Sequence, residues 1–542
     1  MTSYKRAYIG TSIVAFLIAI VLSAANLYLG DLNQDEGWYL YAARLVAAGQ
    51  WPYIDFAFTQ GPVMPLVYAL FAPVIAVGGL AGGRLITALL GLVAAVLAAR
   101  LAARLVNPEL RAGAALTTFI LIVVNVYQSY FCTVVKTYSL TALLLMLGFL
   151  ALAGGWTRRR AGLMLIAGAF MALAAGTRVS AGVILPIVCL CLLASRRSAP
   201  SLAWLYFGLG AATMAGLVFL PFLILAPESF LYCIMQYHAL RHSGDGLMTL
   251  AFKIGFLSRL LQAYFVAFIV GIFIVFAKWA QARAPATMAT PAAMAAPAAM
   301  AAPTAMAAPT ATITPVLMRI LWLSIAAITL IHFLAPFPYD DYQVFVFPLL
   351  AVAIANAAIR LVGRRGALWL TLAILIASLG AAGSSPLNQD WFIQGRDRIW
   401  WLIKDRSPLQ KLRDTAALIR QETQPVDLLL TQDPYIAVEA NRQVPRGLEM
   451  GQFSYFPALS DDQAAKLHVF NRAGFERLLR TTEAPIAALS GYALAIQSPE
   501  VTPLTEEDMA LFTEIVTDRY TPMTNVPSFG QAGTTLKIYR KK

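Results

Sequence analysis

The sequence predicts a mainly α-helical membrane protein of about eleven transmembrane helices, followed by a soluble α/β domain. Of its 542 residues, 59% are hydrophobic and only 13% are charged, which is typical of chains that cross a membrane many times. From about residue 385 the hydrophobicity falls. The chain therefore divides into a membrane domain, 1–384, and a soluble domain, 385–542.

Eleven apolar segments are each long enough to span a bilayer, which takes about 20 apolar residues. They lie near residues 7–29, 84–104, 112–131, 138–156, 161–177, 179–195, 200–225, 256–277, 317–335, 343–361 and 366–384. A further apolar run, 61–83, would put later basic loops on the wrong side if it also crossed. We expect it to lie in or dip into the interface and to bend at Gly78-Gly79 and Gly82-Gly83.

The net charge of +13 follows the membrane topology. The membrane domain holds 23 Lys and Arg against 9 Asp and Glu, whereas the last 158 residues hold 18 against 19. The basic clusters fall between alternate spans, as expected of cytoplasmic loops. They are Lys5-Arg6, Arg100/Arg104/Arg111, Arg158-Arg159-Arg160, Arg196-Arg197, Lys278/Arg283/Arg319 and Arg360/Arg364/Arg365. This pattern places the N-terminus on the cytoplasmic side of the membrane and the soluble domain on the other side, and it calls for no nucleic-acid partner. We expect the membrane to be the inner membrane of a bacterium.

Two segments carry no expected chemistry of their own. An Ala/Pro/Met-rich stretch, about 285–315, has a proline every six residues and is expected to be a disordered cytoplasmic linker. The soluble domain shows helical patterns at 409–423, 462–480 and 505–517 and strand patterns at 427–431, 486–490, 492–497 and 534–539. It shows no nucleophile triad and no metal-ligand spacing, so we expect it to cover the membrane site or to shape acceptor choice.

The strongest sign of chemistry is the adjacent pair Asp35 and Glu36, directly after the first span. Removing two carboxylates from water is costly, so a pair at the membrane surface indicates a function. The plainer alternative is a solvated helix N-terminus, where acids suit the helix dipole. We favour acid–base catalysis by Asp35 and Glu36.

Other polar residues collect at the ends of several spans on the same predicted face. Cations there could hold the phosphate of a lipid-linked sugar, and a carboxylate could take the proton of an acceptor hydroxyl. The candidates for binding the donor phosphate are Arg178, Arg241, Lys136 and His238, and those for shaping the substrate site are Tyr53, Asp55, His242, Asp340 and Asp341. Each of these residues also has an interpretation without function. Arg178 could anchor at the interface, residues 238–242 could form an ordinary loop, Asp55 could be a structural cap, and residues 340–341 could form a solvated turn.

The stretch from Asp35 to Pro62 resembles the first external loop of GT-C membrane glycosyltransferases. The residues that carry the resemblance are Asp35-Glu36-Gly-Trp-Tyr39, Ala42-Ala43-Arg44, Gly49-Gln-Trp-Pro52-Tyr53-Ile-Asp55 and Gly61-Pro62. The nearest branch looks like the protein O-mannosyltransferases and the aminoarabinose (lipid A) transferases. The resemblance implies a GT-C-like core over 1–384, interfacial helices in this loop, a polyprenyl-phosphate sugar donor, inversion at the anomeric carbon, and Asp35 as the base.

One departure from that family concerns metal binding. Many relatives carry a second acid where the third span ends, but here that stretch reads Val134-Val135-Lys136-Thr137-Tyr138. The lysine favours donor binding that requires no metal and no other cofactor. A divalent cation, with Asp340 and Asp341 replacing the second acid, is the less favoured alternative.

The sequence therefore predicts a glycosyltransferase of the cell envelope that moves a hexosyl or pentosyl group to a lipid, protein or glycan acceptor. A transporter or lipid flippase, or a non-catalytic membrane scaffold, are the alternatives. A transporter commonly shows paired halves and charges in mid-span, and neither is found. A scaffold would not need an outward cluster of acids and bases.

Overall fold

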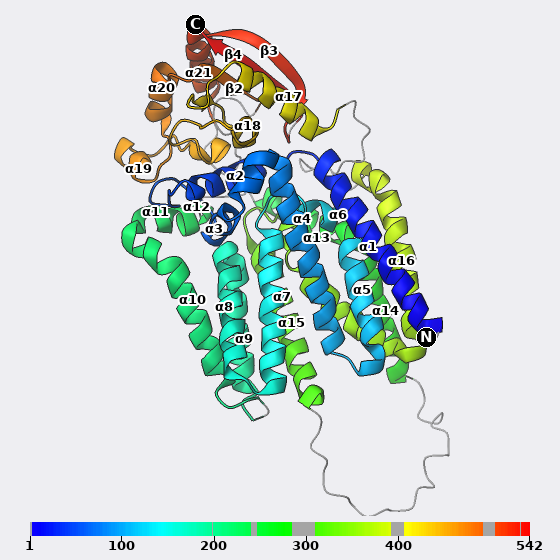
Figure 1. The fold of residues 1–542 in the computed structure, drawn as a ribbon. Coiled ribbons are helices and arrows are strands. Elements are labelled where there is room, and N and C mark those ends of the chain that lie inside the picture. Colours follow the sequence, from blue (N-terminus) through cyan, green and yellow to red (C-terminus); the bar gives the residue numbers. More distant parts are fainter. Residues whose placement is uncertain are drawn as a thin grey trace, which may run out of the picture.

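The computed structural model describes residues 3–197, 199–239, 246–283, 309–391, 406–491, 504–531 and 533–542. Long helices form a bundle, and a smaller C-terminal region, 406–542, covers one end of it (Figure 1). We call this covered end the capped end. Because the chain is mainly helical with a small C-terminal sheet, the predicted fold class is confirmed in outline.

Seven helices among the described residues are long and apolar enough to cross a membrane. They are α1 (Ser3–Leu29), α4 (Ala72–Arg104), α7 (Tyr138–Arg158), α10 (Ala203–Leu225), α14 (Phe265–Arg283), α15 (Pro309–Leu334) and α16 (Phe347–Trp391). Shorter helices complete the bundle: η1 (Pro108–Leu110), α5 (Arg111–Val123), α6 (Val126–Phe131), α8 (Ala161–Thr177), η2 (Val179–Val183), α9 (Ile184–Ala194) and α13 (Gly246–Ala263). The count of eleven crossings stays a prediction.

Helix α16 contains two of the predicted spans, and the chain reverses between them. Gly363 has φ 65° and ψ −172°, a conformation that only glycine adopts readily. Phe347 and Ala381 line the same cavity, although one straight helix would hold them about 50 Å apart. Arg360, near the bend, donates to the carbonyl of Leu105 at the other end of the bundle. The two halves therefore run antiparallel.

Two other predicted spans are broken in the structure. The segment 112–131 is interrupted at Asn125, whose side chain caps α6 by accepting from the Gln128 amide at 2.8 Å. The segment 256–277 straddles two helices that meet at Tyr264. An apolar run does not reveal such breaks, because a capped turn buried among helices can be as apolar as a span.

The first loop folds into α2 (Gln34–Ala47) and α3 (Val63–Ala69), which lie at the capped end (Figure 1). The predicted bend is found at Gly79, with φ 56° and ψ −135° inside α4. The second predicted bend is wrong, because Gly82 and Gly83 lie in regular helix. Glycine is needed there for packing: a Cβ on Gly83 would lie 2.6 Å from Leu40.

The C-terminal region holds a four-stranded sheet in the order β1-β2-β4-β3, with β1 and β2 parallel and the other pairs antiparallel. Its elements are α17 (Pro408–Gln421), β1 (Leu429–Leu430), α18 (Pro434–Ala440), η7 (Gly451–Ser454), α19 (Asp461–Lys466), α20 (Arg472–Thr481), β2 (Ile486–Leu489), α21 (Glu506–Arg519), β3 (Tyr520–Phe529) and β4 (Thr534–Lys541). The predicted strand 492–497 lies outside the described residues, and the predicted helix 462–480 is two helices, α19 and α20. Strand β3 was not predicted.

Candidate functional site

The two acids that follow α1 sit in the first turn of α2. Asn33 caps this helix. Its side-chain oxygen accepts from the backbone amide of Asp35 at 3.1 Å, and its backbone amide donates to Glu36 Oε2 at 3.0 Å. This reciprocal capping satisfies amides that a helix N-terminus leaves without partners. Because successive helical residues point about 100° apart, the side chains of Asp35 and Glu36 face different surroundings.

Glu36 faces the interior of the bundle, where it is fully buried against Arg84. Arg84 Nε lies 2.8 Å from Oε1 and Nη2 lies 2.7 Å from Oε2, and both side chains are 0% exposed. The backbone amide of Val135 also donates to Oε1, at 3.2 Å. The carboxylate thus has no exposed face, and in this conformation it has no route to a substrate.

The remaining donors of Arg84 bind the end of α1. Nη1 donates to the carbonyls of Leu27 and Gly30 at 3.2 and 3.0 Å, and Nη2 donates to that of Asp31 at 2.7 Å. The pair therefore ties together α1, α2, α4 and the loop that leads into α7. Arg84 was not among the predicted site residues. Its signal was available, because an arginine inside an apolar run must find partners or stay out of the membrane.

Asp35 faces the other way and is partly open, with a side chain 28% exposed. Its Oδ2 lies 3.2 Å from Lys136 Nζ, and its Oδ1 accepts from Trp38 Nε1 at 3.2 Å. Lys136 Nζ also lies 2.7 Å from Asp341 Oδ2, which accepts from the Tyr138 hydroxyl at 2.8 Å. One ammonium group therefore links two carboxylates from distant parts of the chain.

Arg178 lies at the break between α8 and η2, where its backbone is extended. Its Nη1 donates to Thr137 Oγ1 at 3.2 Å, and its guanidinium carbon is 4.2 Å from the centroid of the Tyr342 ring. The residue is 8% exposed, yet its Nε has no hydrogen-bond partner among the described residues. A buried guanidinium that leaves one donor without a partner has capacity for a further acceptor, such as an oxygen of an anion.

Tyr39 shows that these charged groups form one electrostatic neighbourhood. Burial raises the pKa of Tyr39 well above its ordinary value; nearby Asp35 raises it further, whereas Arg178 and Lys136 oppose the shift. The phenol therefore stays protonated at neutral pH. It can donate a hydrogen bond within the site but cannot act as a base.

The segment after α15 forms η6 (Asp340–Gln343), and its two acids have different partners. Asp341 is 6% exposed and belongs to the Lys136 cluster. Asp340 lies 2.6 Å from Arg259 Nε and accepts from the Tyr127 hydroxyl. Both acids are thus engaged with cations, and the alternative of a solvated turn does not describe Asp341.

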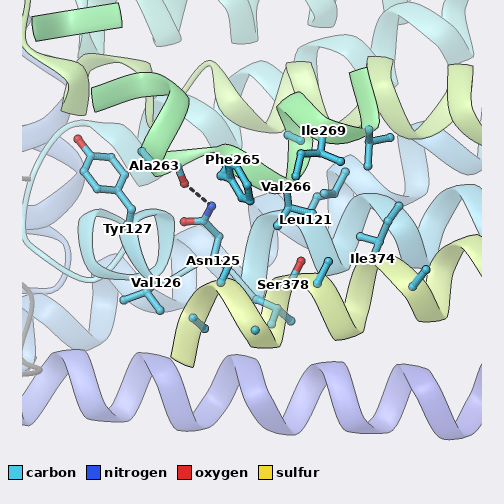
Figure 2. A pocket seen from close by; sticks show the side chains of 18 of the residues that line it. Leu121, Asn125, Val126, Tyr127, Ala263, Phe265, Val266, Ile269, Ile374 and Ser378 are labelled. Atoms are coloured by element: carbon cyan, nitrogen blue, oxygen red, sulfur yellow. Dashed lines mark hydrogen bonds between the residues drawn. The ribbon is translucent and has the colours of Figure 1, made fainter. Parts of the chain in front are cut away.

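An apolar cavity of about 700 Å³ lies beside this charged network, between α5, α6, α14 and α16. Figure 2 shows its aliphatic lining, with Leu121, Ile269 and Ile374 among the side chains, and its polar end at Asn125 and Tyr127. Asn125 Nδ2 donates to the Ala263 carbonyl at 2.8 Å. Because Tyr127 bonds Asp340, the cavity ends one residue along the chain from Asp341.

Tyr53, Asp55 and His238 each bond a residue of the first loop. Tyr53 is 0% exposed in a group of aromatic rings, and its hydroxyl donates to the Gln60 carbonyl. Asp55 caps its own loop by accepting from the Trp51 amide at 2.7 Å. A ring nitrogen of His238 lies 3.0 Å from the Thr59 carbonyl. Arg241 and His242 lie outside the described residues.

Within the described ranges, no group of three or more His, Cys, Asp or Glu residues is arranged to hold a metal ion. The position between Asp35 and Asp341 is taken by Lys136 Nζ. The prediction that the protein needs no cofactor remains a prediction.

The sequence matches no protein-family model and no curated protein. Among solved structures, the chain is similar to ArnT from Cupriavidus metallidurans bound to undecaprenyl phosphate, with a TM-score of 0.54, 15% identity and 98% of each chain covered. It is also similar to the apo oligosaccharyltransferase of Archaeoglobus fulgidus, with a TM-score of 0.51, 12% identity, and 99% of this chain and 74% of that chain covered. These identities establish a likeness of fold alone. At that level the predicted resemblance to GT-C membrane glycosyltransferases is confirmed.

Proposed function

We propose that the protein is a membrane glycosyltransferase that moves a sugar from a polyprenyl-phosphate donor to a hydroxyl acceptor, with Asp35 as the base. The observation that carries this proposal is the pairing of a partly open carboxylate with a buried arginine that has an unused donor. Asp35 is 28% exposed beside Lys136, and Nε of Arg178 is unpaired among the described residues. Arg178 bonds Thr137, the residue after Lys136, so one site offers a base for the acceptor and a cation for the phosphate.

In the proposed reaction, Asp35 accepts the proton of the acceptor hydroxyl as its oxygen attacks the anomeric carbon. The bond from that carbon to the phosphate oxygen breaks, and its electron pair stays on the phosphate. Attack from the face opposite the phosphate inverts the anomeric centre. Lys136 and Trp38 hold the two carboxylate oxygens in place, so the base is oriented before the acceptor arrives.

The leaving phosphate gains negative charge as its bond to the sugar breaks. Arg178 can meet it with a planar fork of donors, and Lys136 with a point charge, and both are worth more in a site shielded from water. Arg241 and His238 are further candidates for this role. Because Lys136 stands between the two carboxylates, we propose that no divalent cation is needed.

The prenyl chain of the donor needs an apolar path next to the charged cluster. The cavity of about 700 Å³ supplies one, since its polar end adjoins the Asp340–Asp341 segment. In support, ArnT, which shares this fold, is described as bound to undecaprenyl phosphate. Tyr53, Asp55, and His242 are proposed to support or shape the acceptor side.

The basic clusters support an orientation with the site outside the cytoplasm. Several helices run away from the capped end and finish at or near a basic cluster at the other end (Figure 1). These are α4 with Arg100 and Arg104, α7 with Arg158, α9 with Arg196 and α14 with Arg283. By the positive-inside rule the basic end faces the cytoplasm. We therefore propose a bacterial inner-membrane enzyme with eleven crossings, a catalytic domain over 1–384 and an extracytoplasmic domain over 385–542.

The test begins with the donor. Mass spectrometry of lipid that co-purifies with the protein identifies the polyprenyl-phosphate sugar, which is then offered to the purified protein with candidate lipid, peptide and glycan acceptors. Asp35→Asn is expected to slow the release of polyprenyl phosphate by about a hundredfold or more, because the amide cannot accept the proton.

The matched control is Asp414→Asn, the same change at an exposed carboxylate of α17 that bonds Arg406 and Gln410. It should release polyprenyl phosphate at the wild-type rate. Wild-type turnover by Asp35→Asn would refute the proposed mechanism.

A further inference from the structure

The outer face of α2 is held by the C-terminal region, at both ends and in the middle. At its start, Gln34 Nε2 donates to Asp433 Oδ1 at 2.7 Å. In the middle, the Tyr41 hydroxyl accepts from the Val444 amide at 3.0 Å. At its end, Arg44 Nη2 donates to the Arg442 carbonyl at 3.0 Å. These partners all come from one segment, 433–453.

Gly37 lets this segment approach the backbone of α2. A Cβ on Gly37 would lie 2.4 Å from the Tyr435 amide nitrogen, a distance at which backbone must move. Glycine inside a helix costs about 0.8–1 kcal/mol relative to alanine. Gly37 lies two residues from Asp35, so the close approach is made next to the proposed base.

The same segment also holds the bend of α4. Glu439 Oε2 accepts from the Leu80 amide at 2.8 Å, and a Cβ on Gly79 would lie 2.0 Å from that oxygen. Helix α4 carries Arg84, whose pairing with Glu36 holds the inner face of α2. Helix α18 therefore contacts both helices on which the position of Asp35 depends.

A third contact reaches the immediate surroundings of Asp35. The ring of Phe453 lies 6.2 Å from that of Trp38, edge to face. Trp38 Nε1 in turn donates to Asp35 Oδ1. The segment thus touches a direct partner of the proposed base.

We infer that the segment 433–453 is a positioning part of the catalytic site, which fixes α2 and thereby sets Asp35 against Lys136. The inference rests on the proposed function of Asp35. A 14-residue helix is marginally stable alone and gains its position from what packs on it. A displacement of about 1 Å can cost about a hundredfold in rate. The C-terminal region, which has no catalytic pattern of its own, thereby takes part in catalysis.

The first test is Gly37→Ala in the full chain, with Gly216→Ala as the matched control. Gly216 also lies inside a helix, α10, but a Cβ there would meet nothing within 4 Å. Gly37→Ala should lower kcat about tenfold or more while leaving the donor KM nearly unchanged, because Arg178 and the cavity are not on α2. Gly216→Ala should match the wild type. An unchanged kcat in Gly37→Ala would overturn the inference.

A double-mutant cycle covers the case in which Gly37→Ala does not fold. Gln34→Ala and Asp433→Ala should each lower kcat, and the double variant should lose no more than Asp433→Ala alone, because that substitution already removes the Gln34 contact together with the bond from Tyr435. Arg472→Ala, which breaks an ion pair with Asp508 inside the C-terminal region, should keep the wild-type kcat. Additive losses, or none, would overturn the inference.

Hydrogen exchange of the backbone amides separates this inference from the proposed function, since it needs no turnover. Exchange over residues 34–47 should be faster in Gly37→Ala and in Asp433→Ala than in the wild type. If the wild type transfers no sugar but exchange rises, the positioning of α2 stands and the glycosyltransferase proposal fails. If exchange does not change, the positioning role itself is wrong.

Discussion

Two acid–base clusters begin one residue apart on α2, and they differ in what is left unsatisfied. Glu36 and Arg84 are fully buried, and their charges and donors are used within the protein. Asp35 is partly open beside Lys136, and Arg178, which bonds Thr137, keeps an unused Nε among the described residues. The closed cluster joins four segments of the bundle, whereas the open one retains capacity for a ligand. Saturated hydrogen bonds mark the closed pair as structural, whereas the open cluster is the one for which we propose chemistry.

The largest expected effect is on stability, from opening the closed cluster. Arg84→Ala leaves the Glu36 carboxylate buried without its partner, and should lower the free energy of unfolding by about 3–5 kcal/mol. Thermal unfolding in detergent measures the change. Replacing both residues, as Arg84→Met with Glu36→Gln, should recover part of it because no unpaired charge remains. A wild-type unfolding temperature in Arg84→Ala would contradict the assignment.

The next effect is on donor binding, from the open cluster. Arg178→Ala should weaken the affinity for the polyprenyl-phosphate donor by about ten- to a hundredfold, the value of about 1.5–3 kcal/mol for a charged hydrogen bond. Arg178→Lys should restore little, because an ammonium cannot reproduce the planar fork that stacks on Tyr342. Titration with labelled donor lipid measures the affinity. If the affinity is unchanged in Arg178→Ala, this residue is an interfacial anchor and does not bind the donor phosphate.

A smaller effect is expected from the cavity. Ala373 lines it, and Ala373→Trp should raise the KM for a long-chain donor severalfold while sparing a donor with a very short prenyl chain. The control is Ala99→Trp, because Ala99 lines a separate apolar groove between α1, α4 and α5. Equal effects of the two substitutions, or equal effects on long and short donors, would remove the cavity from the donor path.

The smallest expected effect is on how the stability depends on pH. It comes from Glu449, a third acid at the contact between α2 and the C-terminal region. Burial raises the pKa of Glu449 from 4.5 to about 7. A raised pKa in the folded state gives stability that is present below pH 4.5 and lost as the pH rises to about 7. Glu449→Gln should therefore flatten the fall in unfolding temperature across that window. An identical slope in both proteins would contradict a buried Glu449.

Asp35 can be predicted as a site residue from the sequence, because its motif and its position after the first span are both local features. The partners of Asp35 are not local in the sequence. Lys136 bonds Asp341 across 205 positions, and only the fold brings the turn before α7 to η6. Apolar length predicts most helices, but not the capped turn at Asn125. Strand β3 was not predicted because it carries prolines at 522 and 527 and many polar residues, a composition that is typical of loops.

Glu36 also shows what the sequence alone does not predict. As the neighbour of Asp35 in the sequence, it was expected to share in catalysis, but one step along a helix turns its side chain toward Arg84. The pairing needs the two glycines before Arg84, which let α4 pack closely on α2 and on its own first turns. Neighbours in sequence can thus have different surroundings, and only the fold distinguishes them.

The central claim is best tested by measuring turnover and unfolding temperature on the same preparations of Asp35→Asn and Glu36→Gln. Both substitutions replace a carboxylate by a nearly isosteric amide, and they lie one residue apart. We expect Asp35→Asn to lose about a hundredfold or more in turnover with an unfolding temperature near that of the wild type. Glu36→Gln should lose more in unfolding temperature and less in turnover. The reverse pattern, with Asp35→Asn active and Glu36→Gln stable but inactive, would contradict the account.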